Sequence, residues 1–184
     1  MGFFDSLFGR TRMPAGKTDA LFALSTAALD IEVKLDSTYS GRAAIVLRSV
    51  DNSAYDAVSR DIQELLAVGG SDFTAKVRVE HDKMGFHWIL FDGPELEDAI
   101  NGLHMTADLI KQGGFGDSLL AAMFQFGSWY LIYNYRRAAF YPFVQTGPSR
   151  RESSREFRIR QTLIDALPME KDPERWYPLW DPPL

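Results

Sequence analysis

Four polar side chains that could bind a metal ion or act as an acid–base pair lie along one predicted helix. They are Glu97, Asn101, His104 and Asp108, at i, i+4, i+7 and i+11. Carboxylate and imidazole groups are ligands of zinc and iron, but ligands from one helix rarely complete a coordination sphere. Neither of the other two histidines can be placed near them from the sequence. We therefore expect a solvated helix face, with a metal-binding or hydrolytic enzyme using Glu97, His104 and Asp108 as the alternative.

Other motifs do not add catalytic chemistry. The glycine-rich run Gly113–Gly116 lacks the Lys-Ser pair of a phosphate loop and follows a helix, so we interpret it as a helix C-terminal cap. The chain has no Gly-x-Ser-x-Gly or His-Glu-x-x-His pattern. It also lacks cysteine, which excludes disulfides and thiolate zinc sites. We predict no catalytic residue, no metal and no cofactor.

Aromatic residues surround the basic pair Arg136-Arg137, a pattern that superficially matches a platform for single-stranded nucleic acid. The rings belong to Tyr130, Tyr133, Tyr135, Phe140, Tyr141 and Phe143. Strands are rich in aromatic residues for packing reasons alone, and a formal net charge of -5 disfavours general nucleic-acid binding. We expect core packing and no nucleic-acid partner, and a single-stranded nucleic-acid binder is the second alternative.

The N-terminal segment is unusually apolar for a chain terminus. In a helix its large apolar residues would share one face, with Arg10, Arg12 and Lys17 following on the polar side. The apolar residues are Phe3, Phe4, Leu7 and Phe8. We expect this face either to pack on its own domain or to bind a partner or a membrane surface.

The C-terminal tail combines two tryptophans, Trp176 and Trp180, with four prolines. Proline excludes a regular helix there. We expect an extended strap whose tryptophans pack on the domain's own surface, or a partner-binding peptide in polyproline conformation.

Positive charge is concentrated near the end of the chain. Between residues 136 and 160 there are seven arginines against two glutamates. In a predicted helix over Ser153–Leu167, extended back to include residue 151, Arg151, Arg155 and Arg158 recur at i, i+4 and i+7 and form an exposed stripe. A solvated face is one interpretation, and an acidic coiled-coil partner or anionic lipid headgroups would suit the stripe as a binding surface.

The elements that position these residues fit one folded domain. A chain of 184 residues that is 46% hydrophobic and 24% charged can bury a substantial core. We predict an N-terminal segment and linker at 1–16, one domain at 17–168 and the strap at 169–184. No run resembles a signal peptide or is long enough to span a bilayer, so we expect a cytoplasmic protein, at most peripheral to the inner membrane.

The first half of the domain shows strand and helix patterns. A helix is predicted from Thr18 to about Ser25, and apolar and charged residues alternate over Leu29–Asp36 as in a half-buried strand. Ala43–Arg48 is its predicted hairpin partner, with the turn at Tyr39–Gly41. A helix is predicted from residues 51–53 to Leu66.

The second half predicts strands at Phe73–Glu80 and Phe86–Phe91, then a helix with a capping box at Asp92–Glu95. Three strands follow at residues 119–126, 129–135 and 138–144, the first central and the last at an edge because of Pro142. The order α-ββα-ββα-βββ-α predicts an α+β fold, mainly an antiparallel sheet with helices packed on it.

Several motifs in order along the chain resemble the PspA-associated protein PspAB family. They are MGFFDSLFGR at the start, DALFAL at Asp19–Leu24, GFHW at Gly85–Trp88, GFG around Phe115, YLIYNYRRAAFYPF at Tyr130–Phe143, and the final LP-x-E and ERWYPLW. The resemblance implies a cytoplasmic, non-enzymatic accessory of the phage shock protein A system, which maintains membranes under envelope stress. Its expected partner is a phage shock protein A-type coiled-coil protein or the inner membrane surface, and the oligomeric state is left open.

Overall fold

The computed structural model describes residues 19–48, 60 and 76–184. Its elements are η1 (Asp19–Phe22), α2 (Ala23–Leu35), β1 (Tyr39–Arg48), β2 (Lys76–His81), β3 (Phe86–Asp92), α4 (Leu96–Gln112), η2 (Gly116–Ser118), β4 (Leu119–Phe126), β5 (Trp129–Asn134), β6 (Ala139–Phe143), β7 (Gln145–Gly147), β8 (Arg150–Arg151), α5 (Ser153–Leu163) and η3 (Pro173–Arg175). A six-stranded antiparallel sheet, in the order β2-β3-β1-β4-β5-β6, forms the centre of the fold. The predicted α+β class is confirmed.

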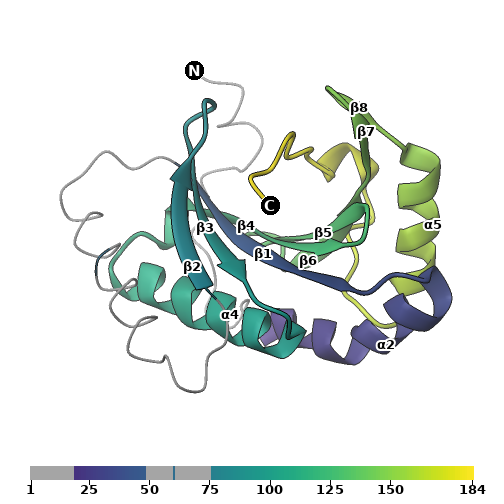
Figure 1. Ribbon diagram of the computed structural model, residues 1–184, viewed down its shortest axis with the longest axis horizontal. Coiled ribbons are helices and arrows are strands. Elements are labelled where there is room, and N and C mark those ends of the chain that lie inside the picture. The colour runs from purple at the N-terminus through teal and green to yellow at the C-terminus, as the bar shows by residue number, and fades with distance from the viewer. Residues whose placement is uncertain (1–18, 49–59, 61–75) are drawn as a thin grey trace.

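The sheet is curved, and its two faces are covered differently (Figure 1). Helices α2 and α4 pack on one face, whereas the C-terminal strap (residues 169–184) lies in the concave face. Side chains of β3 point alternately to the two faces of the sheet. Ile89 and Phe91 belong to the apolar cluster on the helix side, and Trp88 and Leu90 belong to the cluster on the strap side. Both faces are therefore apolar, which explains why central strands such as β4 are buried almost throughout.

The second half of the chain folds largely as its pattern predicts. Strand β3, helix α4 and strands β4 to β6 lie within a few residues of their predicted bounds. The apolar stripe of α4 is buried, from Leu96 to Ile110, and Gly113 caps the helix by donating its backbone N–H to Leu109 O. Pro142 lies in β6 at the sheet edge, where a missing N–H is tolerated.

The predicted capping box before α4 is wrong. The helix begins at Leu96, so Pro94 precedes it, and Glu95 is the N-cap residue with no side-chain hydrogen bond to the helix. Asp92 instead ends β3 and accepts a hydrogen bond from Arg78 at 3.0 Å. The backbone N–H of Gly93 donates to Gly41 O at 2.9 Å, which holds this segment against β1.

The predicted strand over Leu29–Asp36 is also wrong, because α2 continues to Leu35. Leu24, Ala27 and Ile31 recur at helical spacing and are fully buried, whereas Leu29 and Val33 are 67% and 71% exposed. The alternation in this segment therefore reflects exposed apolar residues and not a strand face. Asp36 ends the helix in the left-handed conformation, with φ 48°.

Two further predicted bounds differ from the structure. The predicted turn at Tyr39–Gly41 lies inside β1, which pairs with β3 and β4 and not with a hairpin partner before it. Helix α5 ends at Leu163, four residues earlier than predicted, and the short pair β7–β8 precedes it. The helix predicted from residues 51–53 to Leu66 lies outside the described residues.

Candidate functional site

The strap begins as an extension of the β6 edge. Phe140 N donates to Pro168 O at 2.8 Å, and Glu170 N donates to Phe140 O at 2.7 Å, which forms a parallel bridge between Phe140 and Met169. These bonds cover part of an edge strand that would otherwise expose unpaired backbone groups. The chain is thereby directed from the sheet edge onto the concave face.

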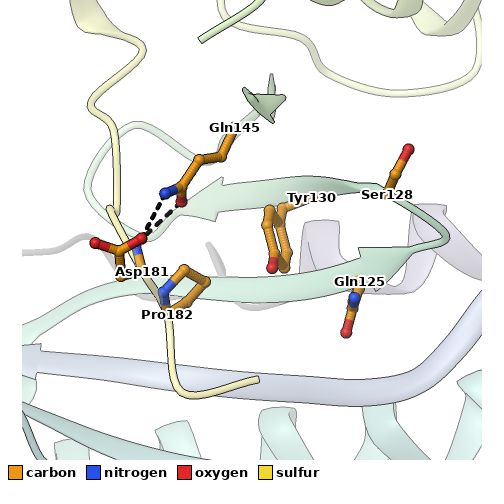
Figure 2. Close-up of a pocket in the computed structure, with 6 residues that line it drawn as sticks. All are labelled: Gln125, Ser128, Tyr130, Gln145, Asp181 and Pro182. Carbon is orange, nitrogen blue, oxygen red and sulfur yellow. Dashed lines mark hydrogen bonds between the residues drawn. The ribbon is translucent and has the colours of Figure 1, made fainter. Parts of the chain in front are cut away.

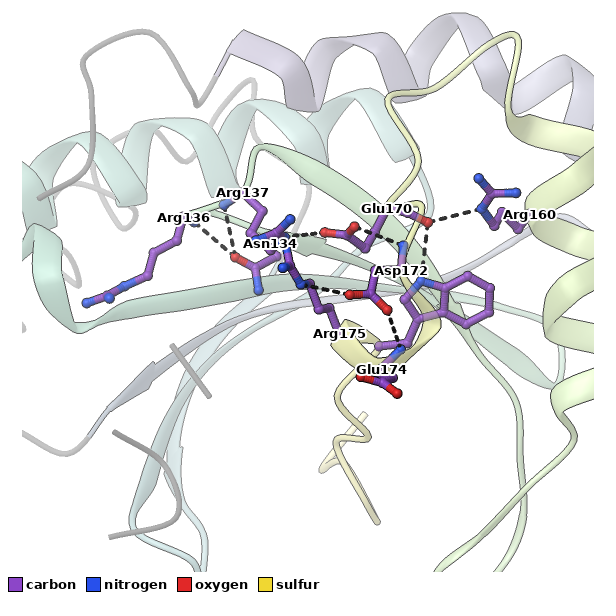
Figure 3. A network of polar contacts seen from close by, with 9 residues as sticks. Asn134, Arg136, Arg137, Arg160, Glu170, Asp172, Glu174 and Arg175 are labelled. Atoms are coloured by element: carbon purple, nitrogen blue, oxygen red, sulfur yellow. Dashed lines mark hydrogen bonds and ion pairs between the residues drawn. The ribbon is translucent and has the colours of Figure 1, made fainter. Parts of the chain in front are cut away.

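Glu170 is the polar centre of this region (Figure 3). Its carboxylate, 7% exposed, pairs with the guanidinium of Arg137 and accepts the backbone N–H of Asp172 at 3.1 Å. Its carbonyl oxygen accepts from Arg160 Nε at 3.0 Å and from Trp176 Nε1 at 3.3 Å. One residue thus joins the β5–β6 turn, α5 and the first tryptophan of the strap.

The environment of Glu170 keeps its carboxylate ionised. Burial acts to raise the pKa of Glu170, but the hydrogen bond and charge of Arg137 and the backbone N–H groups of Asp172 and Lys171 outweigh it, so the pKa lies below its ordinary value. The buried negative charge is therefore matched by a fixed positive charge and by backbone donors.

Two side-chain oxygens stabilise the turns that carry Arg137 and Glu170 (Figure 3). Asn134 Oδ1 accepts the backbone N–H groups of Arg136 and Arg137 at 3.0 and 3.2 Å. On the strap, Asp172 accepts the backbone N–H of Glu174 at 3.1 Å, which caps η3. Asparagine and aspartate commonly stabilise turns in this way.

A second buried ion pair supports the middle of the strap. Glu156, 1% exposed, accepts both from Arg151 Nε, at 2.8 and 3.0 Å, and from Val144 N at 2.8 Å. Arg151 Nη1 also donates to Trp176 O at 2.7 Å, and its guanidinium carbon lies 5.4 Å from the centre of the Phe143 ring. Arg151 therefore bridges α5, the sheet and the strap.

The strap then crosses the concave face in extended form. Trp176 and Leu179 are buried, and Tyr141 Oη donates to Tyr177 O at 3.0 Å. The Trp180 ring meets Phe143 edge to face, with centroids 5.2 Å apart. Far across the sheet, Arg78 of β2 donates to Pro183 O at 3.1 Å. The strap therefore spans the sheet from the β6 edge to the β2 edge.

Near its end the strap lines one side of an open pocket of about 430 Å³ (Figure 2). Its lining residues are Gln125, Ser128, Tyr130, Gln145, Asp181 and Pro182. Gln145 and Asp181 form a reciprocal pair, in which Gln145 Nε2 donates to Asp181 Oδ1 at 2.5 Å and Asp181 N donates to Gln145 Oε1 at 3.0 Å. Gln125 Oε1 is buried and has no hydrogen-bond partner among the described residues.

The predicted arginine stripe is wrong in one of its three members. Arg151 lies in β8, before the helix, and its side chain is engaged by Glu156 and the strap. Arg155 and Arg158 do lie on α5, and Arg155 donates to Ser128 Oγ at 3.0 Å while Arg158 is exposed. A binding role of the two helical arginines stays a prediction.

Both predicted strap tryptophans pack on the chain's own domain. Trp176 is 3% exposed and its ring centre lies 5.2 Å from that of Phe157, and Trp180 packs on Phe143. This is the first of the two arrangements that the tail composition predicts. The single turn η3 is the helical part of the strap, and Pro173 is at its start.

The alternative polar site on α4 forms a short chain of contacts. His104 Nε2 lies 3.3 Å from Asp108 Oδ2, and Lys111 Nζ lies 3.1 Å from Asp108 Oδ1. Glu97 is exposed about two turns before His104 on the same helix. Within residues 19–48, 60 and 76–184, no group of three or more histidine, aspartate or glutamate side chains could hold a metal ion.

The aromatic rings around Arg136-Arg137 are mostly buried. The five rings of Tyr133, Tyr135, Phe140, Tyr141 and Phe143 are each at most 2% exposed. Burial raises the pKa of Tyr135, with Tyr133 and Asp108 adding to the shift. Bases cannot stack on rings enclosed in the core, so these five rings do not form a platform for single-stranded nucleic acid. The N-terminal residues Phe3, Phe4, Leu7 and Phe8 lie outside the described residues, and their binding role stays a prediction.

Sequence reasoning missed the polar residues that hold the strap, notably Glu156, Glu170 and Gln145. Buried carboxylates are rare, and a lone glutamate in a charged helix is normally exposed. The pairing of Glu170 with a cluster of arginines could have been suspected from the local excess of positive charge. The Gln145–Asp181 pair joins residues far apart in the chain and left no local signal.

Comparison with known proteins identifies a family. A family model described as PspAB, PspA associated protein B, matches residues 1–184, the whole length of the chain. No curated protein and no solved structure gives a match to this chain.

Proposed function

Since the chain belongs to the PspA associated protein B family, we propose that it is a non-enzymatic accessory of a phage shock protein A-type stress response and binds its partner directly. The observation that carries this proposal is the outer face of α5, which stands at one end of the molecule (Figure 1). Arg158 lies on this exposed side of the helix, with Phe157 on one flank and Arg155 on the other. An accessory protein needs such an exposed surface more than it needs a catalytic pocket.

The outer face of α5 combines charge with an apolar contact. Phe157 is 48% exposed although its ring touches Trp176. Arg158 is exposed, and its guanidinium forms no ion pair among the described residues. Arg155, one turn before it, is held by Ser128 and not by an acidic group. Aromatic and arginine side chains are the residues most often found at the energetic centres of protein interfaces.

The partner that this chemistry fits is an acidic helix, as in a coiled coil of phage shock protein A type. Carboxylates on such a helix can pair with Arg155 and Arg158, while an apolar residue packs on Phe157. Long-range attraction would also speed the encounter and would weaken as salt is added. In the described part of the chain, none of the helices has the length and apolar character of a membrane span.

The test is calorimetric titration of the phage shock protein A homologue from the same organism into the purified chain. Replacing both arginines, R155Q/R158Q, should weaken binding about tenfold at low ionic strength and flatten its dependence on salt. The matched control K34Q/K83Q removes two exposed cations from other surfaces. It should bind like the wild type.

Thermal unfolding of both variants should match the wild type, because exposed charges contribute little to stability. Equal affinity of R155Q/R158Q and wild type, or an equal loss in the control, would contradict the proposal. If the wild type instead binds vesicles of anionic lipid and not the homologue, the surface serves a membrane.

A further inference from the structure

The two halves of the strap are held very differently. In the first half, up to Leu179, Trp176 and Leu179 are buried and the backbone carbonyls of residues 170, 176 and 177 accept bonds from side chains. In the second half, Trp180–Leu184, no residue is buried. Three hydrogen bonds hold it, two with Gln145 and one from Arg78, and Trp180 and Leu184 pack only partly buried against the strap-side cluster. The last five residues can therefore open while the first half stays in place.

The closed position of these five residues carries identifiable costs. Asp181 has φ 47°, a left-handed conformation that is unfavourable for a residue with a Cβ. Asp181 and Pro182 line one side of an open pocket whose other lining residues come from the sheet and its loops, so these two residues leave that space unfilled. Gln125 also lines this pocket, and its Oε1 atom is buried without a hydrogen-bond partner among the described residues.

The strap itself cannot supply the missing donor there. Pro182 and Pro183 have no backbone N–H, so neither can satisfy Gln125. Gln125 and Pro182 line the same pocket, so a segment with an ordinary residue in place of Pro182 would bring a backbone N–H to the pocket that holds the unsatisfied oxygen. The strap end of this chain therefore leaves one buried acceptor of the groove unsatisfied.

We propose that residues 180–184 are a displaceable occupant of a peptide-binding groove on the concave face, and that the groove binds an extended, tryptophan- and proline-containing segment of another protein. The groove already binds a segment of this kind from its own chain, through the Phe143 ring and the donor that Arg78 offers to a backbone carbonyl.

The contacts that the groove makes with the strap end indicate which peptide segments it would prefer. Phe143 packs edge to face on a tryptophan ring, Gln145 pairs with both the backbone and a side chain of the bound segment, and Arg78 donates to a backbone carbonyl. A proline suits the position at Arg78, because the contact there uses only its carbonyl oxygen. The surface is separate from the outer face of α5, so this inference stands independently of the proposed function.

The strap end and the peptide of another protein compete for the groove, and this competition sets the apparent affinity for the peptide. When only a fraction of molecules is open, the apparent dissociation constant is the intrinsic one divided by that fraction. The variant Asp181→Ala removes the bond from Gln145 Nε2 that holds the strap end, leaves Gln145 in place for the peptide, and should raise the open fraction about tenfold. Deleting residues 180–184 removes the competitor altogether.

The probe is the acetylated pentapeptide Trp-Gly-Ala-Pro-Leu, which lacks the strained aspartate and the first proline of the strap end. It is titrated, with detection by chemical-shift changes, into full-length wild type, D181A and the chain lacking residues 180–184. The expected order of affinity is the truncated chain first, then D181A, which should bind about tenfold tighter than wild type. The matched control is Q161A, which truncates an exposed glutamine on α5 and should bind like wild type.

A second substitution tests the unsatisfied acceptor. In the truncated chain, Gln125→Ala should weaken peptide binding about five- to tenfold, because the peptide N–H loses its partner. The inference is overturned if the truncated chain binds no tighter than wild type, or if Q161A tightens binding as much as D181A does. It is also overturned if D181A binds the peptide no more tightly than wild type does.

Discussion

The two faces of the sheet are covered by different kinds of structure, one by helices and the other by an extended segment. On the helix side, α2 and α4 satisfy their own backbone hydrogen bonds and bury mainly apolar side chains such as Ile31 and Leu103. On the concave side, the strap has no regular internal hydrogen bonds apart from one short turn, and side chains of the sheet and α5 bond to its backbone. The helices are thus held on the sheet mainly by apolar packing, whereas the strap is held by apolar packing together with specific polar contacts.

This difference predicts where the molecule is sensitive to polar substitutions. A helix-covered face loses stability mainly when a cavity is made in it. A strap-covered face also loses stability when a single donor is removed, because a backbone carbonyl then lies over apolar surface without a partner. The predictions below test that contrast, beginning with the largest expected effect.

The buried pair of Arg151 and Glu156 should be the most sensitive polar contact. Glu156→Ala leaves the guanidinium unpaired and deprives Val144 N of its acceptor, so the free energy of unfolding should fall by about 3–5 kcal/mol. Chemical denaturation measures this loss, and Arg158→Gln on the exposed side of α5 is the control with a change near zero.

A double substitution separates charge from packing at this pair. If an apolar pair fills the same space, as in R151M/E156L, much of the loss should be recovered, because burying two charges is itself costly. The strap bond to Trp176 O would still be missing, so recovery should be incomplete. Full recovery would show that this donor is dispensable and would weaken the contrast between the two faces.

An intermediate effect is expected at Glu170, and it depends on pH. Because the folded-state pKa of Glu170 lies below its ordinary value, the carboxylate stabilises the fold above pH 4.5, and this contribution is lost as the pH falls below that. Glu170→Gln should lower stability at pH 7 by about 1–3 kcal/mol. The variant should also lose less stability than wild type between pH 5 and pH 3, as measured by thermal unfolding at each pH. Parallel curves for the two proteins would mean that Glu170 is not held ionised by its partners.

The sequence was most informative where burial leaves a regular pattern. The apolar stripe of α4 and the doubly buried strand β4 are readable because their neighbours along the chain share one environment. The strap was predictable as extended from its prolines, but its route was not, since Gln145 and Arg78 are distant in sequence. Arg151 was misassigned because a partner five residues away, Glu156, draws it inward and not toward solvent.

The smallest expected effect tests the element that the alternating pattern misassigned. In a strand over Leu29–Asp36, Leu29 and Ile31 would share one buried face, and polar substitution at either would be costly. In α2, Leu29 is 67% exposed whereas Ile31 is fully buried. Leu29→Gln should therefore change the free energy of unfolding by no more than about 0.5 kcal/mol. The matched substitution Ile31→Gln places an unpaired amide in the core and should cost at least about 2 kcal/mol. Chemical denaturation of the two variants distinguishes the alternatives, because similar losses at both positions would support the strand and a loss confined to Ile31 supports the helix.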